Sequence, residues 1–127
     1  MSSPPKSQIL LGHMDWNIQH FEQILNNEKT DYYRDAAIQR FCLVFDATQK
    51  TLRAFAEEKG KTIQTSEECF QFAHVERWTE DSSQSILDDY KLVKDGFEAD
   101  LAETIYPRLP AHHVSLQKLH STLSKSS

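Results

Sequence analysis

Glycine is scarce in this chain, with three residues in 127. An all-β protein needs turn residues at short intervals, so the scarcity argues against a turn-rich all-β fold. It also excludes the glycine-rich phosphate loops GxGxxG and GxxxxGK[ST], because neither can be assembled from these residues. The sequence therefore lacks the signature of a nucleotide-binding loop.

Cysteine is rarer still, and the two residues, Cys42 and Cys69, lie far apart within helical patterns. Neither forms a CxxC pair, so both a zinc site and a disulfide lack support. Buried thiols that pack as small hydrophobes are the simplest interpretation. We expect no cofactor.

The histidines do not form a metal site by spacing. His112 and His113 are adjacent, and adjacent side chains on a helix point about 100° apart. His13 and His20 share one helix face, but two turns, or about 10.5 Å, separate them. We expect no metal.

The net charge of the chain argues against a generic polyanion ligand. Fourteen Lys and Arg against nineteen Asp and Glu give a net charge of −5. The sequence therefore has no strong nucleic-acid signal, although a local basic patch is compatible with this net charge. No apolar run approaches the ~18 residues of a membrane span. The segment 1–5 lacks the basic and apolar regions of a signal peptide. We expect a cytoplasmic protein without a membrane partner.

Helical periodicity dominates what is present. An apolar stripe spaced three and four residues apart begins near the N-terminus, with Trp16 outside it. Its members are Leu11, Met14, Ile18, Phe21 and Leu25. The length of the chain suits one domain, 1–127, in which we expect 1–5 and 121–127 to be flexible.

A second helix is predicted from about Tyr32 to Lys59, capped by Thr30 or Asp31 and ended by Gly60. Its apolar face is unusually wide, which is typical of a helix that is central in a bundle or buried in an oligomer interface. We expect a homodimer through this wide face. Its members are Ala37, Ile38, Phe41, Cys42, Val44, Phe45, Ala47, Leu52, Phe55 and Ala56.

Shorter helices follow. Thr65 and Glu68 have the spacing of a capping box and open a third helix, a fourth is predicted over 80–94, and Pro107 and Pro110 should break or bend the last. No segment alternates with period two for long enough to demand a strand. The sequence therefore predicts an all-α, antiparallel four- or five-helix up-and-down bundle.

Arg34, Asp35 and Arg40, at the start of the second helix, are the best functional candidates. In one interpretation the two arginines meet an anionic ligand, either a nucleotide phosphate or an acidic patch on a partner. In the other, Arg34 and Asp35 are surface charges, and Arg40 pairs with Asp88 or Asp89 of the fourth helix.

Four segments carry a family resemblance: 34–41, 50–52, 88–89 and 101–106. Together they resemble the nucleotidyltransferase substrate-binding proteins, relatives of the HEPN superfamily, over roughly residues 11–119. The resemblance implies a HEPN-like bundle that dimerises beside a separate minimal nucleotidyltransferase chain, often as a toxin–antitoxin pair. It implies a noncatalytic subunit with a groove for a nucleotide or partner, which we assign to Arg34, Asp35, Arg40, Asp89, Tyr90 and Lys91.

The alternative is a metal-independent HEPN ribonuclease, whose relatives carry Arg-x4–6-His after the acidic residue. Here Tyr90 and Asp95 occupy those positions, and they supply neither a cation nor a proton-shuttling imidazole. Arg108 and His113 satisfy the spacing, but they follow the final-helix signature and enclose Pro110, so chance explains them better. We therefore expect no catalytic activity from this chain alone.

Overall fold

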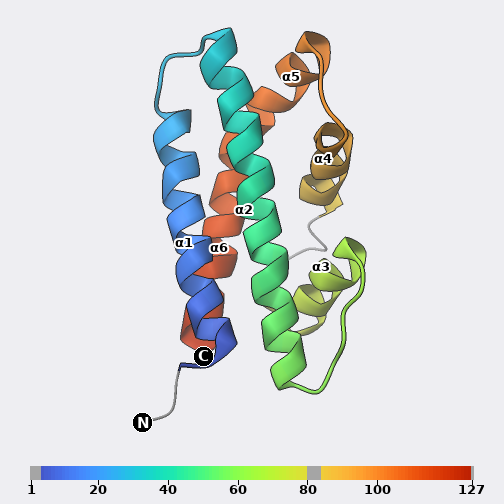
Figure 1. Ribbon diagram of the computed structural model, residues 1–127. Helices are drawn as coiled ribbons and strands as arrows, with labels where there is room; N and C mark the ends of the chain where they lie inside the picture. The colour runs from blue at the N-terminus through green and yellow to red at the C-terminus, as the bar shows by residue number, and fades with distance from the viewer. Residues whose placement is uncertain (1–3, 80–83, 127) are drawn as a thin grey trace.

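The computed structural model describes residues 4–79 and 84–126, and within these ranges it contains helices and no strand. This confirms the all-α bundle (Figure 1). The elements are α1 (Lys6–Leu25), α2 (Asp31–Glu58), α3 (Ser66–Val75), α4 (Gln84–Lys94), α5 (Ala99–Ile105), the 3₁₀ turn η1 (Tyr106–Arg108) and α6 (Leu109–Ser126).

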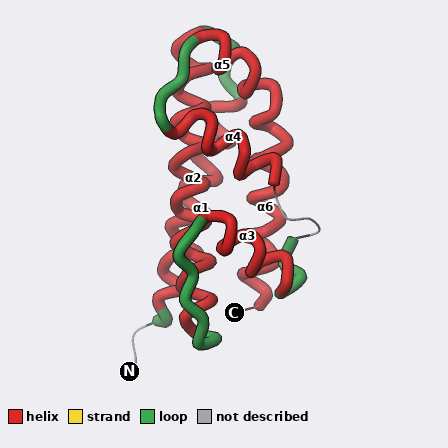
Figure 2. Tube along the Cα trace, turned by 90° about the vertical axis from the view of Figure 1, so that its right-hand side faces the viewer, coloured by secondary structure: helices red, strands yellow, loops and turns green. Residues whose placement is uncertain are grey.

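Helix α2 is the centre of the arrangement, because it packs against α1, α3, α4, α5 and α6. The long helices α1, α2 and α6 lie side by side, while α3, α4 and α5 follow one another along the side of α2 away from α1 (Figures 1 and 2). The start of α1 and the end of α6 lie at the same end of the bundle. No helix among the described residues is long and apolar enough to cross a membrane.

The predicted stripe of α1 forms one wall of the core. Leu11, Met14, Ile18 and Phe21 are buried, and Leu25 is half-buried. Trp16, outside the stripe, is 53 % exposed. Periodicity alone thus fixes which face of α1 points inward.

The wide apolar face of α2 is covered within one chain, which corrects the expectation that it forms the dimer interface. Its apolar residues are buried or half-buried beneath the surrounding helices. The face is wide because α2 is the central helix of the bundle, and not because it is buried in an oligomer interface. A second copy cannot dock there, and the homodimer stays a prediction that needs another surface.

Local signals place the helix ends. The Thr30 hydroxyl accepts a hydrogen bond from the Tyr33 backbone N–H at 3.1 Å, so Thr30 is the cap of α2. Gly60 has φ +76°, the left-handed conformation that ends a helix and favours glycine. Thr65 caps α3 through the Glu68 N–H, as the capping box predicts.

The C-terminal end differs from the expectation. Pro107 lies in η1, where the helix tightens before α6. Beyond it α6 continues to Ser126, and Leu123 is fully buried. The segment 121–126, which we expected to be flexible, is thus helical, and one apolar residue in it reaches the core. The expected first turn of the fourth helix, 80–83, lies outside the described residues.

Candidate functional site

The Arg34 guanidinium is enclosed by carboxylates where α2 begins. Its Nε donates to Asp35 Oδ1 at 2.9 Å, and its Nη1 donates to Glu103 Oε1 of α5 at 2.8 Å and, more weakly, to Asp31 at 3.4 Å. Lys29 pairs with the same Glu103. These hydrogen bonds raise the pKa of Arg34 above its ordinary value, and the bond to Asp35 has the largest effect.

The pKa of Glu103 shifts in the opposite direction. The hydrogen bond from Lys29, followed by that from Arg34, lowers the pKa of Glu103 below its ordinary value. Arg34 itself is only 6 % exposed. The Arg34 guanidinium therefore joins the start of α2 to α5, and little of its surface is accessible to an outside ligand.

Asp89 is the most deeply placed carboxylate of the predicted groove. Its Oδ1 accepts a hydrogen bond from Arg108 Nη1 at 2.7 Å, and its Oδ2 lies 2.7 Å from His112 Nε2. Asp89 and His112 are buried, whereas the Arg108 side chain is 51 % exposed. A guanidinium and an imidazole thus converge on one carboxylate and tie α4 to the last helical segment.

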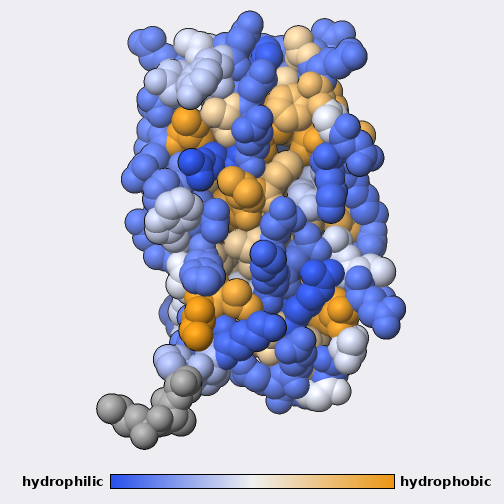
Figure 3. All heavy atoms as spheres, viewed as in Figure 1, coloured by the Kyte–Doolittle hydropathy of each residue, from blue (hydrophilic) through white to orange (hydrophobic). Residues whose placement is uncertain are grey.

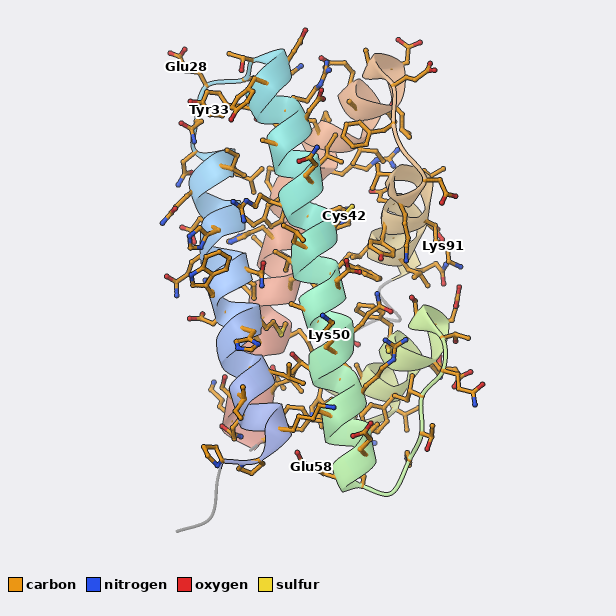
Figure 4. The ribbon with its side chains drawn as sticks, in the orientation of Figure 1. Glu28, Tyr33, Cys42, Lys50, Glu58 and Lys91 are labelled. Carbon is orange, nitrogen blue, oxygen red and sulfur yellow. The ribbon has the colours of Figure 1, made fainter. Side chains whose placement is uncertain are left out.

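Tyr90 and Lys91 follow Asp89 but face other elements. The Tyr90 hydroxyl donates to Asp46 Oδ1 of α2 at 2.6 Å, and its ring stacks on Phe45. Burial, together with the bond to Asp46, raises the pKa of Tyr90. Lys91 pairs with Glu67 of α3 and lies on the outer side of α4 in Figure 4.

Arg40 is half-exposed and forms no ion pair with residues 4–79 or 84–126. The expectation that it pairs with Asp88 or Asp89 is wrong. Asp89 is held by Arg108 and His112, and Asp88 accepts a hydrogen bond from Gln84. The six predicted groove residues therefore point toward different neighbours and do not form one cluster.

A hollow lies instead between α1 and α2, on the face toward the viewer in Figures 3 and 4. Its volume is about 340 Å³, and its lining combines Leu10, His13 and Trp16 with Leu43, Asp46 and Lys50. Apolar patches are open to solvent on this face (Figure 3), and Lys50 projects from its middle (Figure 4). Leu43 is 48 % exposed.

Comparisons with known proteins bear on the fold. No family model matches the chain, and no curated protein matches it. A crystal structure from Thermus thermophilus matches with a TM-score of 0.78, 24 % identity, and coverage of 87 % of this chain and 98 % of that one. The description of that protein names no activity, and at this identity the likeness shows the fold alone.

Sequence reasoning missed the pair Arg108 and His112. It compared Arg108 with His113, whose ring instead meets Phe21 edge-on and whose Nε2 lies 3.7 Å from Glu22 of α1. Because adjacent residues on a helix face different neighbours, His112 contacts Asp89 whereas His113 faces α1. The Arg-x4-His spacing therefore selected the histidine next to the one that lies near Arg108. Among the described residues, no group of three or more His, Cys, Asp or Glu side chains is placed to hold a metal ion.

Proposed function

We propose that this chain is a noncatalytic binding subunit of a two-component nucleotidyltransferase module, of the toxin–antitoxin type. One observation carries the proposal: the charged side chains of the interior are paired within the bundle, whereas an apolar and charged hollow between α1 and α2 stays open. A surface of this kind suits recognition of a partner or ligand.

The ionisable groups support a binding role. Desolvation raises the pKa of Cys42 to about 11, and it also raises the pKa of Cys69. The pKa of Tyr90 is raised as well. These side chains are protonated at neutral pH, so they are poor nucleophiles.

The Asp89, Arg108 and His112 cluster favours the second candidate, a metal-independent ribonuclease. It brings together a cation and an imidazole, the two groups that phosphodiester cleavage uses. Two features weigh against it. His112 is 5 % exposed, and its Nε2 faces the Asp89 carboxylate, so the imidazole lies in the core and stacks on Phe41.

Co-purification tests the binding role. The chain is expressed with the short nucleotidyltransferase encoded by a neighbouring reading frame, with an affinity tag on one chain only. We expect the untagged chain to be retained at a fixed ratio. The absence of such a frame, or failure of the two chains to associate, would overturn the proposal.

Two assays of the purified chain complete the test. ATP and other nucleotides should raise its melting temperature if they bind the native state. Incubation with RNA should give no products. Cleavage by the wild type that is lost in both Arg108→Ala and His112→Ala, with the fold retained by circular dichroism, would replace the binding subunit with the ribonuclease.

A further inference from the structure

The hollow between α1 and α2 has an aromatic wall. Trp16 of α1 is 53 % exposed, and its ring stacks on His20 with 3.7 Å between the ring centroids. His20 Nδ1 lies 2.8 Å from the Trp16 backbone carbonyl oxygen, so a hydrogen bond holds the imidazole behind the indole. His20 covers one face of the indole. Because Trp16 lines the hollow, its other face is available for stacking with a flat ring.

The opposite wall and the floor are apolar. Leu43 of α2 is 48 % exposed, and Ala47 follows it one helical turn later. Both line the hollow together with Leu10 of α1. The short Ala47 side chain leaves room above α2. The volume of about 340 Å³ lies at the lower end of the range of small-molecule sites, so a single aromatic group of modest size fits between the two helices.

Two charges of opposite sign also line the hollow. Asp46 and Lys50 are four positions apart on α2, a spacing at which carboxylates and ammonium groups commonly pair. They do not pair here, and Lys50 forms no ion pair within residues 4–79 and 84–126. Asp46 Oδ1 accepts the Tyr90 hydroxyl of α4 at 2.6 Å instead. A carboxylate has further acceptor capacity, so the hollow offers one cation and one anion to a ligand.

The register between the helices fixes how far the charges lie from the aromatic wall. The Thr51 hydroxyl donates to the Leu10 backbone carbonyl at 3.2 Å. Counting from that bond in these antiparallel helices (Figure 1), Trp16 comes to the level of about residue 45, about 7.5 Å along the axis from Lys50. Helical side chains lean toward the N-terminus of their own helix. Trp16 and Lys50 therefore lean toward each other, and their separation suits the ring and the carboxylate of one aromatic amino acid.

We propose that this hollow binds a free aromatic amino acid as its zwitterion. The ring of the ligand stacks on Trp16 and contacts Leu43. Its α-carboxylate pairs with Lys50, and its α-ammonium group pairs with Asp46. An anion of the same shape would face Asp46 without compensation, and a cation would face Lys50, so the two charges together select a ligand that carries both. The inference rests on the proposed binding function, because it names the ligand class of the same hollow.

Titration of the purified chain with L-phenylalanine and L-tryptophan tests the ligand class, with binding followed by amide chemical shifts. We expect saturable binding with a Kd below about 1 mM. N-acetyl-L-phenylalanine lacks the ammonium charge, L-phenylalaninamide lacks the carboxylate, and L-alanine lacks the ring. Each should bind at least about tenfold more weakly than L-phenylalanine, because each loses one of the three contacts.

Matched variants assign each contact to its residue. Lys50→Gln should weaken L-phenylalanine about tenfold and leave the amide unaffected, since the amide has no carboxylate to lose. Asp46→Asn should weaken L-phenylalanine and the amide but leave the N-acetyl derivative unaffected. A general loss of structure would weaken all ligands alike. Lys118→Gln, at an exposed residue of α6, is the control and should leave every Kd unchanged.

Three results would overturn the inference. One is no saturable shift with any aromatic amino acid at about 10 mM. Another is an N-acetyl or amide derivative that binds as tightly as the free amino acid, which would identify the end of a peptide chain as the occupant. The third is equal loss of all ligands in both charge variants. If the transferase chain still co-purifies, these results remove the ligand and leave the proposed function standing; amino-acid binding without co-purification does the reverse.

Discussion

His112 Nε2 lies 2.7 Å from Asp89 Oδ2, and the other oxygen of that carboxylate is held by Arg108. Because Asp89 is buried, its two partners replace the water that a carboxylate would otherwise need. The His112–Asp89 contact is a polar link between α4 and α6.

Removing this carboxylate should destabilise the fold. Asp89→Ala leaves the His112 ring without its partner in the core, so we expect a loss of about 1–3 kcal/mol in the free energy of unfolding. Chemical denaturation measures it. The exposed neighbour Asp88 is a matched control, and Asp88→Ala should change stability by no more than about 0.5 kcal/mol. Equal effects at the two positions would contradict the role of Asp89.

Glu103 should make stability depend on pH. Its pKa is lowered in the folded state by Lys29 and Arg34, so its contribution is present above its unfolded pKa and is lost as pH falls through the lower folded value. We expect Glu103→Gln to melt below the wild type at pH 7, with the gap closing as the pH falls below the ordinary pKa of a glutamate. Thermal melts followed by circular dichroism measure the gap. Glu28→Gln, at an exposed residue, should show no such trend.

Cys42 should react slowly with thiol reagents. Burial, and then the charge of Asp46, raises its pKa to about 11, so about one molecule in a thousand carries the thiolate at pH 8. The rate with an aromatic disulfide, measured in a Cys69→Ala background, should increase in Asp46→Asn because the raising charge is gone. An unchanged rate would contradict the electrostatic part of the shift.

Two residues of α2 should differ in their effect on stability. Phe41 contacts Phe21, Phe45 and His112 in the core, so Phe41→Ala should cost about 3–5 kcal/mol. Leu43 is exposed, and Leu43→Ala should change the free energy of unfolding of the monomer by less than about 0.5 kcal/mol. Denaturant titrations at low protein concentration measure both. A large loss at Leu43 would place that residue in the core.

The sequence predicts the helices well where apolar periodicity and capping act together. The α1 stripe, the Thr30 cap and the Gly60 terminus are all confirmed, since each depends on interactions within a few residues. Leu123 shows the limit. It continues the three-and-four spacing of Leu116 and Leu119, but the polar residues around it favour a flexible end, and its burial depends on packing against other helices.

The candidate site was less accessible to sequence reasoning. The predicted groove residues have the right types of side chain for a groove, but their partners come from α2, α3, α5 and α6. These residues are Arg34, Asp35, Asp89, Tyr90 and Lys91. Spacing along one helix cannot reveal which neighbouring helix each side chain faces. The hollow between α1 and α2 was missed for a related reason, because it depends on the register between two helices.

The order of synthesis gives the position of α6 a consequence for biogenesis. Helix α6 packs against α1 and carries the buried Leu116, Leu119 and Leu123. Until α6 has been synthesised and has left the ribosome, the apolar stripe of α1 lacks this cover. The nascent chain therefore exposes hydrophobic surface during that interval, and it is a natural client for chaperones.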